Sequence, residues 1–263
     1  MLGRLMKYEI QSTARLFIPL YAVLLVFALL NRFLNPFEVM ETSVSFNLQS
    51  IFQALSVTVY FILIVAIFVM TLFIAIQRFY KNLLGDEGYL MFTLPVKTWQ
   101  NVTSKLLTAI MWYILSAIAV ISSIIVMVGP KDFFEFLPNI TEAIRRGFGD
   151  AGFIILPLFV LVQLIHGTLM IYDAIALGHL FGKQRLLASF GMYIALYFIT
   201  QIILVIVIFS LGGTIFASLI HSAEPTGTQL LTFLGMIGIV AALLSVAHFA
   251  ITNYILKNKL NLE

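Results

Sequence analysis

The chain has 263 residues, of which 61% are hydrophobic and 10% are charged; its formal net charge is +3 and it contains no cysteine. A soluble domain carries roughly 45–50% apolar and about 25% charged residues. Too few charges are present to cover a surface in water, so a soluble enzyme, a disordered protein and a disulfide-stapled secreted domain are excluded. We expect a protein whose outer surface mostly contacts lipid.

At the N-terminus, residues 1–14 carry Leu2, Leu5, Met6 and Ile10 at helical spacing, with polar and charged residues between them. This pattern predicts an amphipathic helix that lies in the cytoplasmic interface of the membrane. A simple solvated tail is the alternative.

Six apolar stretches follow, each close to or above the length of about 20 residues that a helix needs to cross a bilayer core. They do not show the alternation of barrel strands. The sequence therefore predicts an all-α, polytopic membrane protein with one transmembrane domain over residues 1–263. The predicted spans are residues 16–34, 51–76, 102–129, 152–177, 187–211 and 229–256.

The basic residues predict the orientation of these spans. If the N-terminus lies inside, 11 of the 15 Lys and Arg residues fall on the cytoplasmic side. This is the asymmetry that the positive-inside rule requires, so both termini are predicted to be cytoplasmic. The outer connections at residues 35–50 and 130–151 are predicted to be moderate polar loops.

The longest cytoplasmic connection, residues 77–101, contains an apolar run within charged flanks. Tyr89, Leu90, Phe92 and Leu94 are too apolar for a free cytosolic loop, and two acids precede them. Such a patch predicts a docking surface, with packing onto the chain's own helix ends as the alternative. The residues of this predicted docking segment are Gly85, Asp86, Glu87, Gly88, Tyr89, Leu90, Phe92 and Leu94.

Polar side chains within the spans are the candidate pathway residues, because intramembrane polar groups are costly and often functional. Gln163 and His166 either line a cavity or bond a neighbouring helix, and His248 favours an interhelical hydrogen bond over a site. The predicted pathway residues are Gln163, His166, Gln201 and His248.

Asp173 is the only carboxylate inside a predicted span. It follows His166 by seven residues on the same helix face, about 10.5 Å further along the axis, so the two cannot bind one metal ion. Because Asp173 is near the cytoplasmic end of its span, we expect it to pair with a basic loop residue such as Lys183 or Arg185.

Motifs for catalysis are absent from the sequence. It contains neither GxxxxGK(S/T), which a P-loop ATPase needs, nor the zinc motif HExxH. Residues 147–152 match the dinucleotide fingerprint, but an expected loop precedes them where the fingerprint requires a strand. No catalytic site, metal site or nucleic-acid surface is predicted.

Four segments resemble permease subunits of bacterial type-2 ABC exporters. They are LGRLMKYEIQSTAR at residues 2–15, FIPLY at residues 17–21, LLGDEGYLMFTLPVK at residues 83–97 and YILKNKLNLE at residues 254–263. With six spans and both ends inside, the resemblance covers essentially the whole chain, and DEGYLMFTLP is its most specific part.

This resemblance implies a multi-pass protein of the bacterial cytoplasmic membrane. Two permease copies, identical or paired with a close paralogue, would enclose the pathway within the lipid bilayer. Separate cytosolic ABC ATPase subunits would bind ATP and Mg²⁺, so this chain would need no cofactor. Residues 85–94 would couple the permease to the ATPase, and Lys183 and Arg185 would provide a second contact. Residues 214–220 match the position of the family's external re-entrant helices.

Two other functions remain open on the sequence. Pro19 and Pro157 lie three spans apart, each behind a short apolar run, and could mark the inverted repeat of an ion-coupled secondary transporter. A non-transporting membrane subunit that senses or confers immunity is the third reading.

Overall fold

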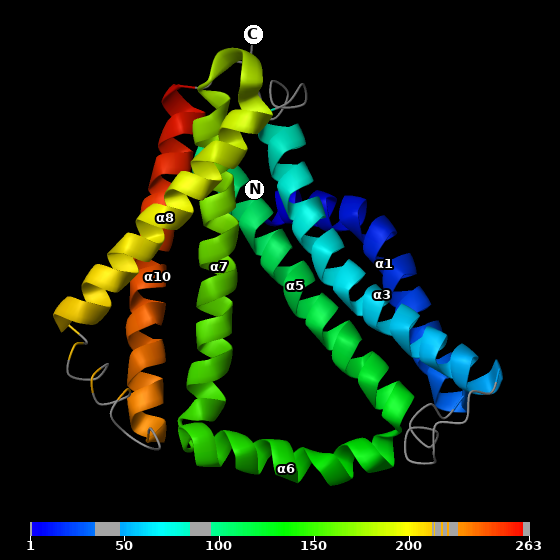
Figure 1. Ribbon diagram of the computed structural model, residues 1–263. Helices are drawn as coiled ribbons and strands as arrows, with labels where there is room; N and C mark the ends of the chain where they lie inside the picture. Colours follow the sequence, from blue (N-terminus) through cyan, green and yellow to red (C-terminus); the bar gives the residue numbers. More distant parts are fainter. Residues whose placement is uncertain are drawn as a thin grey trace. The chain divides into compact units, whose positions relative to one another are not determined.

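The computed structural model describes residues 2–34, 48–84, 96–211 and 226–259, together with Gly213, Ala217 and Ile220. Within these residues the regular structure is entirely helical (Figure 1). Six helices are long and apolar enough to cross a membrane, which confirms the predicted number of spans. The chain is therefore a multi-pass membrane protein.

Most helices exceed the length that the hydrocarbon core requires, so they extend past it or cross it at a tilt. Helix α6 and the short turn η2 are not among the candidate spans, whereas η1 forms the end of the second one. In chain order the elements are α1 (Leu2–Leu34), α3 (Leu48–Phe79), η1 (Tyr80–Leu84), α5 (Thr98–Val128), α6 (Pro130–Phe148), α7 (Gly152–His179), η2 (Gly182–Gln184), α8 (Arg185–Leu211) and α10 (Gly227–Asn258).

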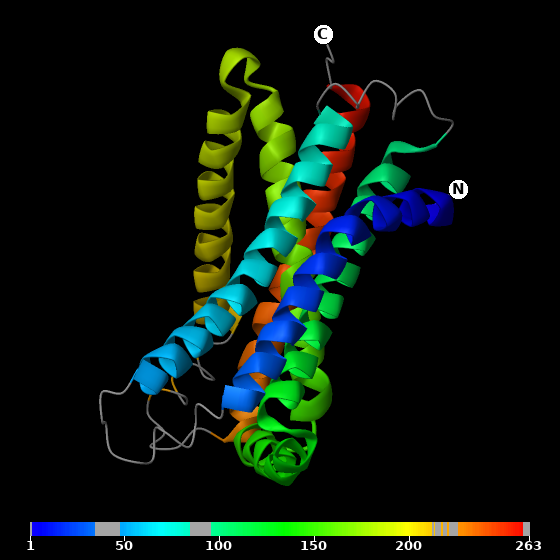
Figure 2. The ribbon, with the colours of Figure 1, turned by 90° about the vertical axis from the view of Figure 1, so that its right-hand side faces the viewer.

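Helix α1 runs continuously through the predicted interfacial segment and the first span. Its first turns bend away from the rest of the helix (Figure 2). Pro19 lies inside α1 and has no N–H to donate to the carbonyl of Arg15, and the loss of such a bond allows a helix to bend. The interfacial position of the first turns stays a prediction.

The predicted polar loop at residues 130–151 is wrong over most of its length, because Pro130–Phe148 forms α6. Pro130 occupies the first helical position, where its missing N–H removes no intrahelical bond. Asp132 lies in the first turn, and Arg145 and Arg146 lie in the last, so these charges complement the helix dipole.

Contacts between Cα atoms divide the chain into two compact units. Unit 1 comprises Met1–Ala75 and Leu107–Pro138, and unit 2 comprises Ile76–Leu106 and Asn139–Glu263. Helices α3, α5 and α6 each contribute residues to both units. Each unit has its own buried apolar clusters.

In unit 1, buried hydrogen bonds join α1, α3 and α5. Tyr60 on α3 shares a hydrogen bond of 2.8 Å with Ser123 on α5. The indole Nε1 of Trp112 on α5 donates to Oγ1 of Thr13 on α1 over 2.8 Å. Between helices in lipid, such bonds stabilise the packing because the same groups would find no water in the hydrocarbon.

In unit 2, α7 is the central helix, because it packs against both α8 and α10. Near its end, Gly178 lies so close to α8 that an added Cβ would be 2.4 Å from the Cα of Ser189. No side chain fits in this space. Glycine at this position therefore permits the tight turn between α7 and α8.

One buried cluster gathers four helix ends on one side of unit 2: the end of α3 with η1, the start of α5, and the ends of α7 and α10. Its members are Phe79, Leu83, Leu84, Val102, Leu169, Tyr172, Ile175 and Leu256. The opposite side holds the starts of α7 and α10. There, a Cβ added to Gly227 would lie 3.1 Å from backbone atoms of Phe148, at the end of α6.

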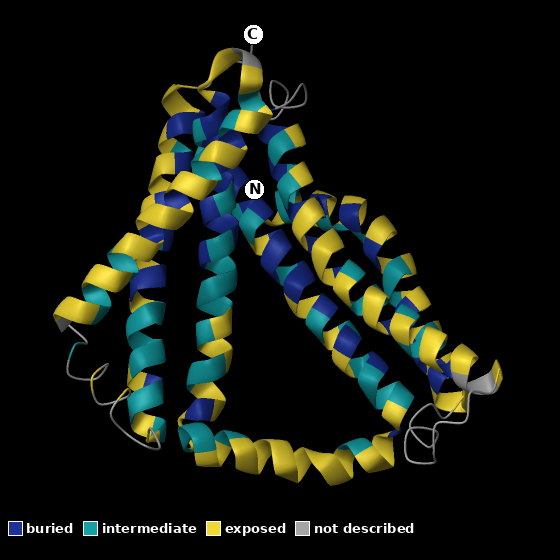
Figure 3. Ribbon diagram, viewed as in Figure 1, coloured by how far each residue is buried: buried dark blue, intermediate teal, exposed yellow. Residues whose placement is uncertain are grey.

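Much of the surface of the spanning helices is exposed and apolar (Figure 3). On α8, for example, Leu186, Leu187, Ile202 and Phe209 are all more than half exposed. Surfaces of this kind would drive association in water, whereas in a bilayer the acyl chains solvate them. The exposed faces are therefore those that lipid or another membrane chain covers.

Candidate polar cavity in the membrane

Helix α7 carries the polar residues of the candidate site. Gln163, His166 and Asp173 follow one another at helical spacing, so they project from one stripe of α7. His166 and Asp173 are 7% and 0% exposed, and His248 on α10 is 5% exposed. Three ionisable side chains are therefore enclosed within unit 2.

Asp173 is bonded to α10. Its Oδ2 shares a hydrogen bond of 2.7 Å with Nδ1 of His248, which confirms the interhelical bond predicted for this histidine. The predicted pairing of Asp173 with Arg185 is wrong, because Oδ2 of Asp173 bonds His248 and its Oδ1 has no partner among the described residues. The Nε of Arg185 instead donates to the carbonyl of Gly182 over 3.3 Å. Asp173 points into the helix packing, toward a residue 75 positions later in the chain, and not toward the turn that follows α7. The side chain of Lys183 is outside the described part of the structure.

The two histidine rings extend this bonded pair. The ring centroids of His166 and His248 are 5.5 Å apart, with an interplanar angle of 43°. Three buried atoms of the group, Oδ1 of Asp173, Nε2 of His248 and Nδ1 of His166, have no hydrogen-bond partner among the residues described. Buried polar atoms of native proteins are normally bonded, so the group has capacity to bind a further polar molecule.

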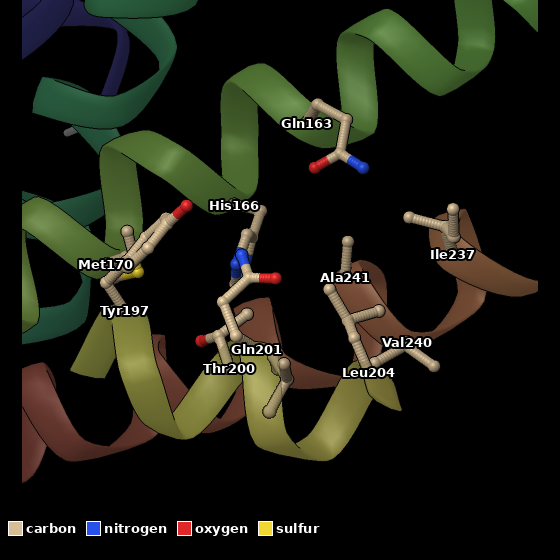
Figure 4. Close-up of a pocket in the computed structure, with 11 residues that line it drawn as sticks. Gln163, His166, Met170, Tyr197, Thr200, Gln201, Leu204, Ile237, Val240 and Ala241 are labelled. Carbon is tan, nitrogen blue, oxygen red and sulfur yellow. The ribbon is translucent and has the colours of Figure 1, made fainter. Parts of the chain in front are cut away.

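A cavity of about 250 Å³ lies beside His166, between α7, α8 and α10 (Figure 4). Its polar lining comes from two amides, the imidazole and two hydroxyl-bearing side chains, and its apolar lining comes largely from α10. The residues that line it are Gln163, His166, Met170, Tyr197, Thr200, Gln201, Leu204, Ile237, Val240, Ala241 and Leu244.

The structure brings three of the four predicted pathway residues to this cavity. Gln163 and His166 reach it from α7, and Gln201 lies on α8 (Figure 4). His248 does not line the cavity, but its ring lies next to that of His166. Thr200 also lines the cavity and was not among the predicted pathway residues, although a threonine directly before an intramembrane glutamine is a readable signal.

The cavity lining combines hydrogen-bonding groups with aliphatic surface. The amides of Gln163 and Gln201 and the ring of His166 offer donors and acceptors, while Leu204 and Val240 offer aliphatic surface. Pockets that combine a few polar groups with apolar walls orient a ligand by its polar end. The cavity therefore suits a small amphipathic molecule, or the amphipathic part of a larger one.

The predicted docking segment, Gly85 to Leu94, lies outside the described residues, as do most residues of the predicted re-entrant stretch. The residues on either side of the docking segment are described, and those before it pack against α7. Phe79 stacks on Tyr172 of α7, with ring centroids 4.0 Å apart and an interplanar angle of 9°.

The two flanks are also bonded to each other. With its amide oriented to match its neighbours, Asn82 accepts a hydrogen bond from Nζ of Lys105 over 3.1 Å and donates to the carbonyl of Arg78 over 3.3 Å. Both Asn82 and Lys105 are buried, at 8% and 2% exposure. The residues on either side of the segment therefore belong to one packed part of unit 2, which we call the docking-segment base: Phe79, Leu83 and Leu84 before the segment, and Val102 and Lys105 after it.

Across the described ranges, no group of three or more His, Asp or Glu side chains is arranged to hold a metal ion. In comparisons with models of protein families, with curated proteins and with solved structures, nothing matches this chain. The resemblance to exporter permeases is therefore an expectation from the sequence motifs alone.

Proposed function

We propose that the chain is the transmembrane permease subunit of an ATP-driven exporter of the ABC class. In this proposal it resides in the bacterial cytoplasmic membrane and pairs with a second copy or a close paralogue. Separate cytosolic subunits dock at residues 85–94 and hydrolyse ATP. The observation that carries the proposal is that the base of this segment packs directly on α7, the helix that also lines the polar cavity.

The docking-segment base is closely packed against α7. Phe79, Leu83 and Leu84 are at most 3% exposed, and they pack with Leu169 and Tyr172 of α7. Close-packed interiors transmit displacement because they have little free volume to absorb it. A force applied to the docking segment therefore reaches α7.

From there the route continues to the cavity. Tyr172 is followed by Asp173, which bonds His248 on α10, and His166 lies two turns earlier on α7 beside the cavity. A shift of α7 against α10 changes the positions of His166 and Gln163 relative to Gln201. Rocking between two such packings is one of the established ways in which proteins switch access to a site.

The distribution of basic residues along the chain supports the same function. The cluster at the docking-segment base also includes Leu256, close to the C-terminal end of α10. Basic residues are concentrated on this side, with Arg78, Lys81 and Lys257 near the helix ends. By the positive-inside rule this side is the cytoplasmic one, where ATP is available.

The test is affinity purification of the tagged chain from its native membranes in mild detergent, with any bound subunit identified by mass spectrometry. We expect a subunit with a P-loop ATPase motif. The triple variant Tyr89→Ala, Leu90→Ala, Phe92→Ala should bind it about 30-fold more weakly, since an interface hot spot contributes about 2 kcal/mol or more.

A matched control removes three apolar side chains from an exposed face of α3. Phe61, Ile62 and Val65 are each about 60% exposed, and their triple alanine variant should retain the ATPase fully. If the unaltered chain captures no ATPase, or if the docking-segment variant captures as much as the control, the proposal fails.

A second candidate function is an ion-coupled carrier, and the buried Asp173 favours it. A carboxyl group bonded to histidine and close to a polar cavity is a common element of intramembrane proton relays. A carrier would work without a partner. The purified chain alone in vesicles with an internal pH dye would then admit protons under an imposed potential, and Asp173→Asn would abolish this flux.

A further inference from the structure

Helix α6 has one apolar and one polar face. At 100° per residue the large apolar side chains fall on one side and the charged ones on the other. None of its residues is buried. The apolar face consists of Phe133, Phe136, Leu137, Ile140 and Ile144, and the polar face consists of Lys131, Asp132, Glu135, Asn139, Glu142 and Arg146.

The N-terminal end of α6 lies at the ends of two spans. A Cβ added to Gly129, which connects α5 to α6, would be 3.5 Å from Oδ2 of Asp132 and 3.7 Å from Nη2 of Arg32. Arg32 belongs to the last turn of α1, and its Nη1 donates to the carbonyl of Val126 over 3.4 Å. The ends of α1 and α5 therefore meet the start of α6.

The C-terminal end of α6 lies at the starts of two further spans. A Cβ added to Gly152, the first residue of α7, would be 3.3 Å from Cγ2 of Ile144. A Cβ added to Gly227, at the start of α10, would be 3.1 Å from the backbone of Phe148. A 19-residue helix is about 28 Å long. Each of its ends therefore adjoins the ends of membrane spans.

Exposed apolar side chains are present on α6 and on the helix ends next to it. Val128, which ends α5, is 40% exposed, and Ile154, in the first turn of α7, is 73% exposed. Phe136 and Ile140 on α6 are 58% and 39% exposed.

We propose that α6 is an interfacial helix that inserts its apolar face into the boundary between headgroups and acyl chains. The occupant of this face is the lipid bilayer. Amphipathic helices of this kind lie about 5–10 Å into that boundary, with their charged face toward water. The polar face of α6, with both acidic and basic groups, matches a layer of zwitterionic and anionic headgroups. This inference does not depend on the proposed transport function.

The absence of cysteine from the chain makes a direct test possible. Single-cysteine variants of the full chain are labelled with the fluorophore NBD and reconstituted into vesicles of phosphatidylcholine and phosphatidylglycerol. Phe136→Cys and Ile140→Cys report the apolar face, and Glu135→Cys and Glu142→Cys are matched controls on the polar face. Quenching by doxyl-labelled lipid is compared with quenching by aqueous iodide.

We expect doxyl lipid to quench the apolar-face labels at least about twofold more than the polar-face labels, and iodide to show the reverse order. Equal iodide quenching on both faces would place α6 in water and overturn the proposal. Apolar-face labels that neither agent quenches would mean that protein covers this face, which also overturns it. Since Phe136 and Ile140 are independent positions, either one that reconstitutes decides the result.

Discussion

The bond between Asp173 and His248 predicts strong energetic coupling between α7 and α10. Both side chains are buried, and their hydrogen bond is 2.7 Å long. Replacing either residue with leucine fills its place in the packing with an apolar side chain but leaves the other polar group enclosed without its partner. Replacing both removes the bond and the unpaired group together.

The expected magnitudes follow from the burial of each group. Asp173→Leu leaves the imidazole of His248 unpaired, which costs about 1–3 kcal/mol for a buried polar group. His248→Leu leaves a carboxyl group at 0% exposure, and breaking a buried pair in this way costs up to about 3–5 kcal/mol. Interhelical bonds in membranes average only about 0.6 kcal/mol, with a maximum near 1.7. We therefore expect about 2 kcal/mol for each single variant and a coupling energy of at least about 1 kcal/mol.

The assay is unfolding of the purified chain in mixed detergent micelles with increasing SDS, followed by far-ultraviolet circular dichroism. The four proteins of the double-mutant cycle are compared with Thr232→Val, an exposed position on α10 whose hydroxyl bonds only its own helix. This control should change the free energy of unfolding by less than about 0.5 kcal/mol. If the effects of Asp173→Leu and His248→Leu simply add in the double variant, the bond does not join the helices and the reasoning is refuted.

Two further predictions use the same unfolding assay. Gly178→Ala should destabilise the chain by about 1–3 kcal/mol, because its Cβ would meet the backbone of Ser189 at 2.4 Å. Gly167→Ala on the same helix meets nothing within 4 Å and should be stabilising by about 0.5–1 kcal/mol, so equal effects of the two would contradict the close approach of α7 and α8. Phe79→Leu removes the stack on Tyr172 and should cost about 1 kcal/mol, and in the assembled complex it should raise the number of ATP molecules hydrolysed per molecule transported. An unchanged ratio would exclude this stack from the proposed coupling route.

The six spans and α6 leave different patterns in the sequence. A span is recognised from its average hydropathy over a window, and all six were predicted in this way. The average over Pro130–Phe148 is low because charged residues balance the aromatic ones, so the same criterion hides a continuous helix. The spacing of Phe133, Phe136 and Ile140 was the signal that could have identified it.

The sequence by itself determined that this is an all-helical protein of the membrane, because a bilayer core offers no water to backbone groups and only long apolar helices satisfy them locally. The identity of polar residues inside those helices was equally readable. Only the tertiary structure decided that Asp173 bonds His248 and that Gln163, His166 and Gln201 share one cavity. Hydropathy is a property of neighbours in the chain, whereas these contacts depend on how α7, α8 and α10 are rotated and packed against each other.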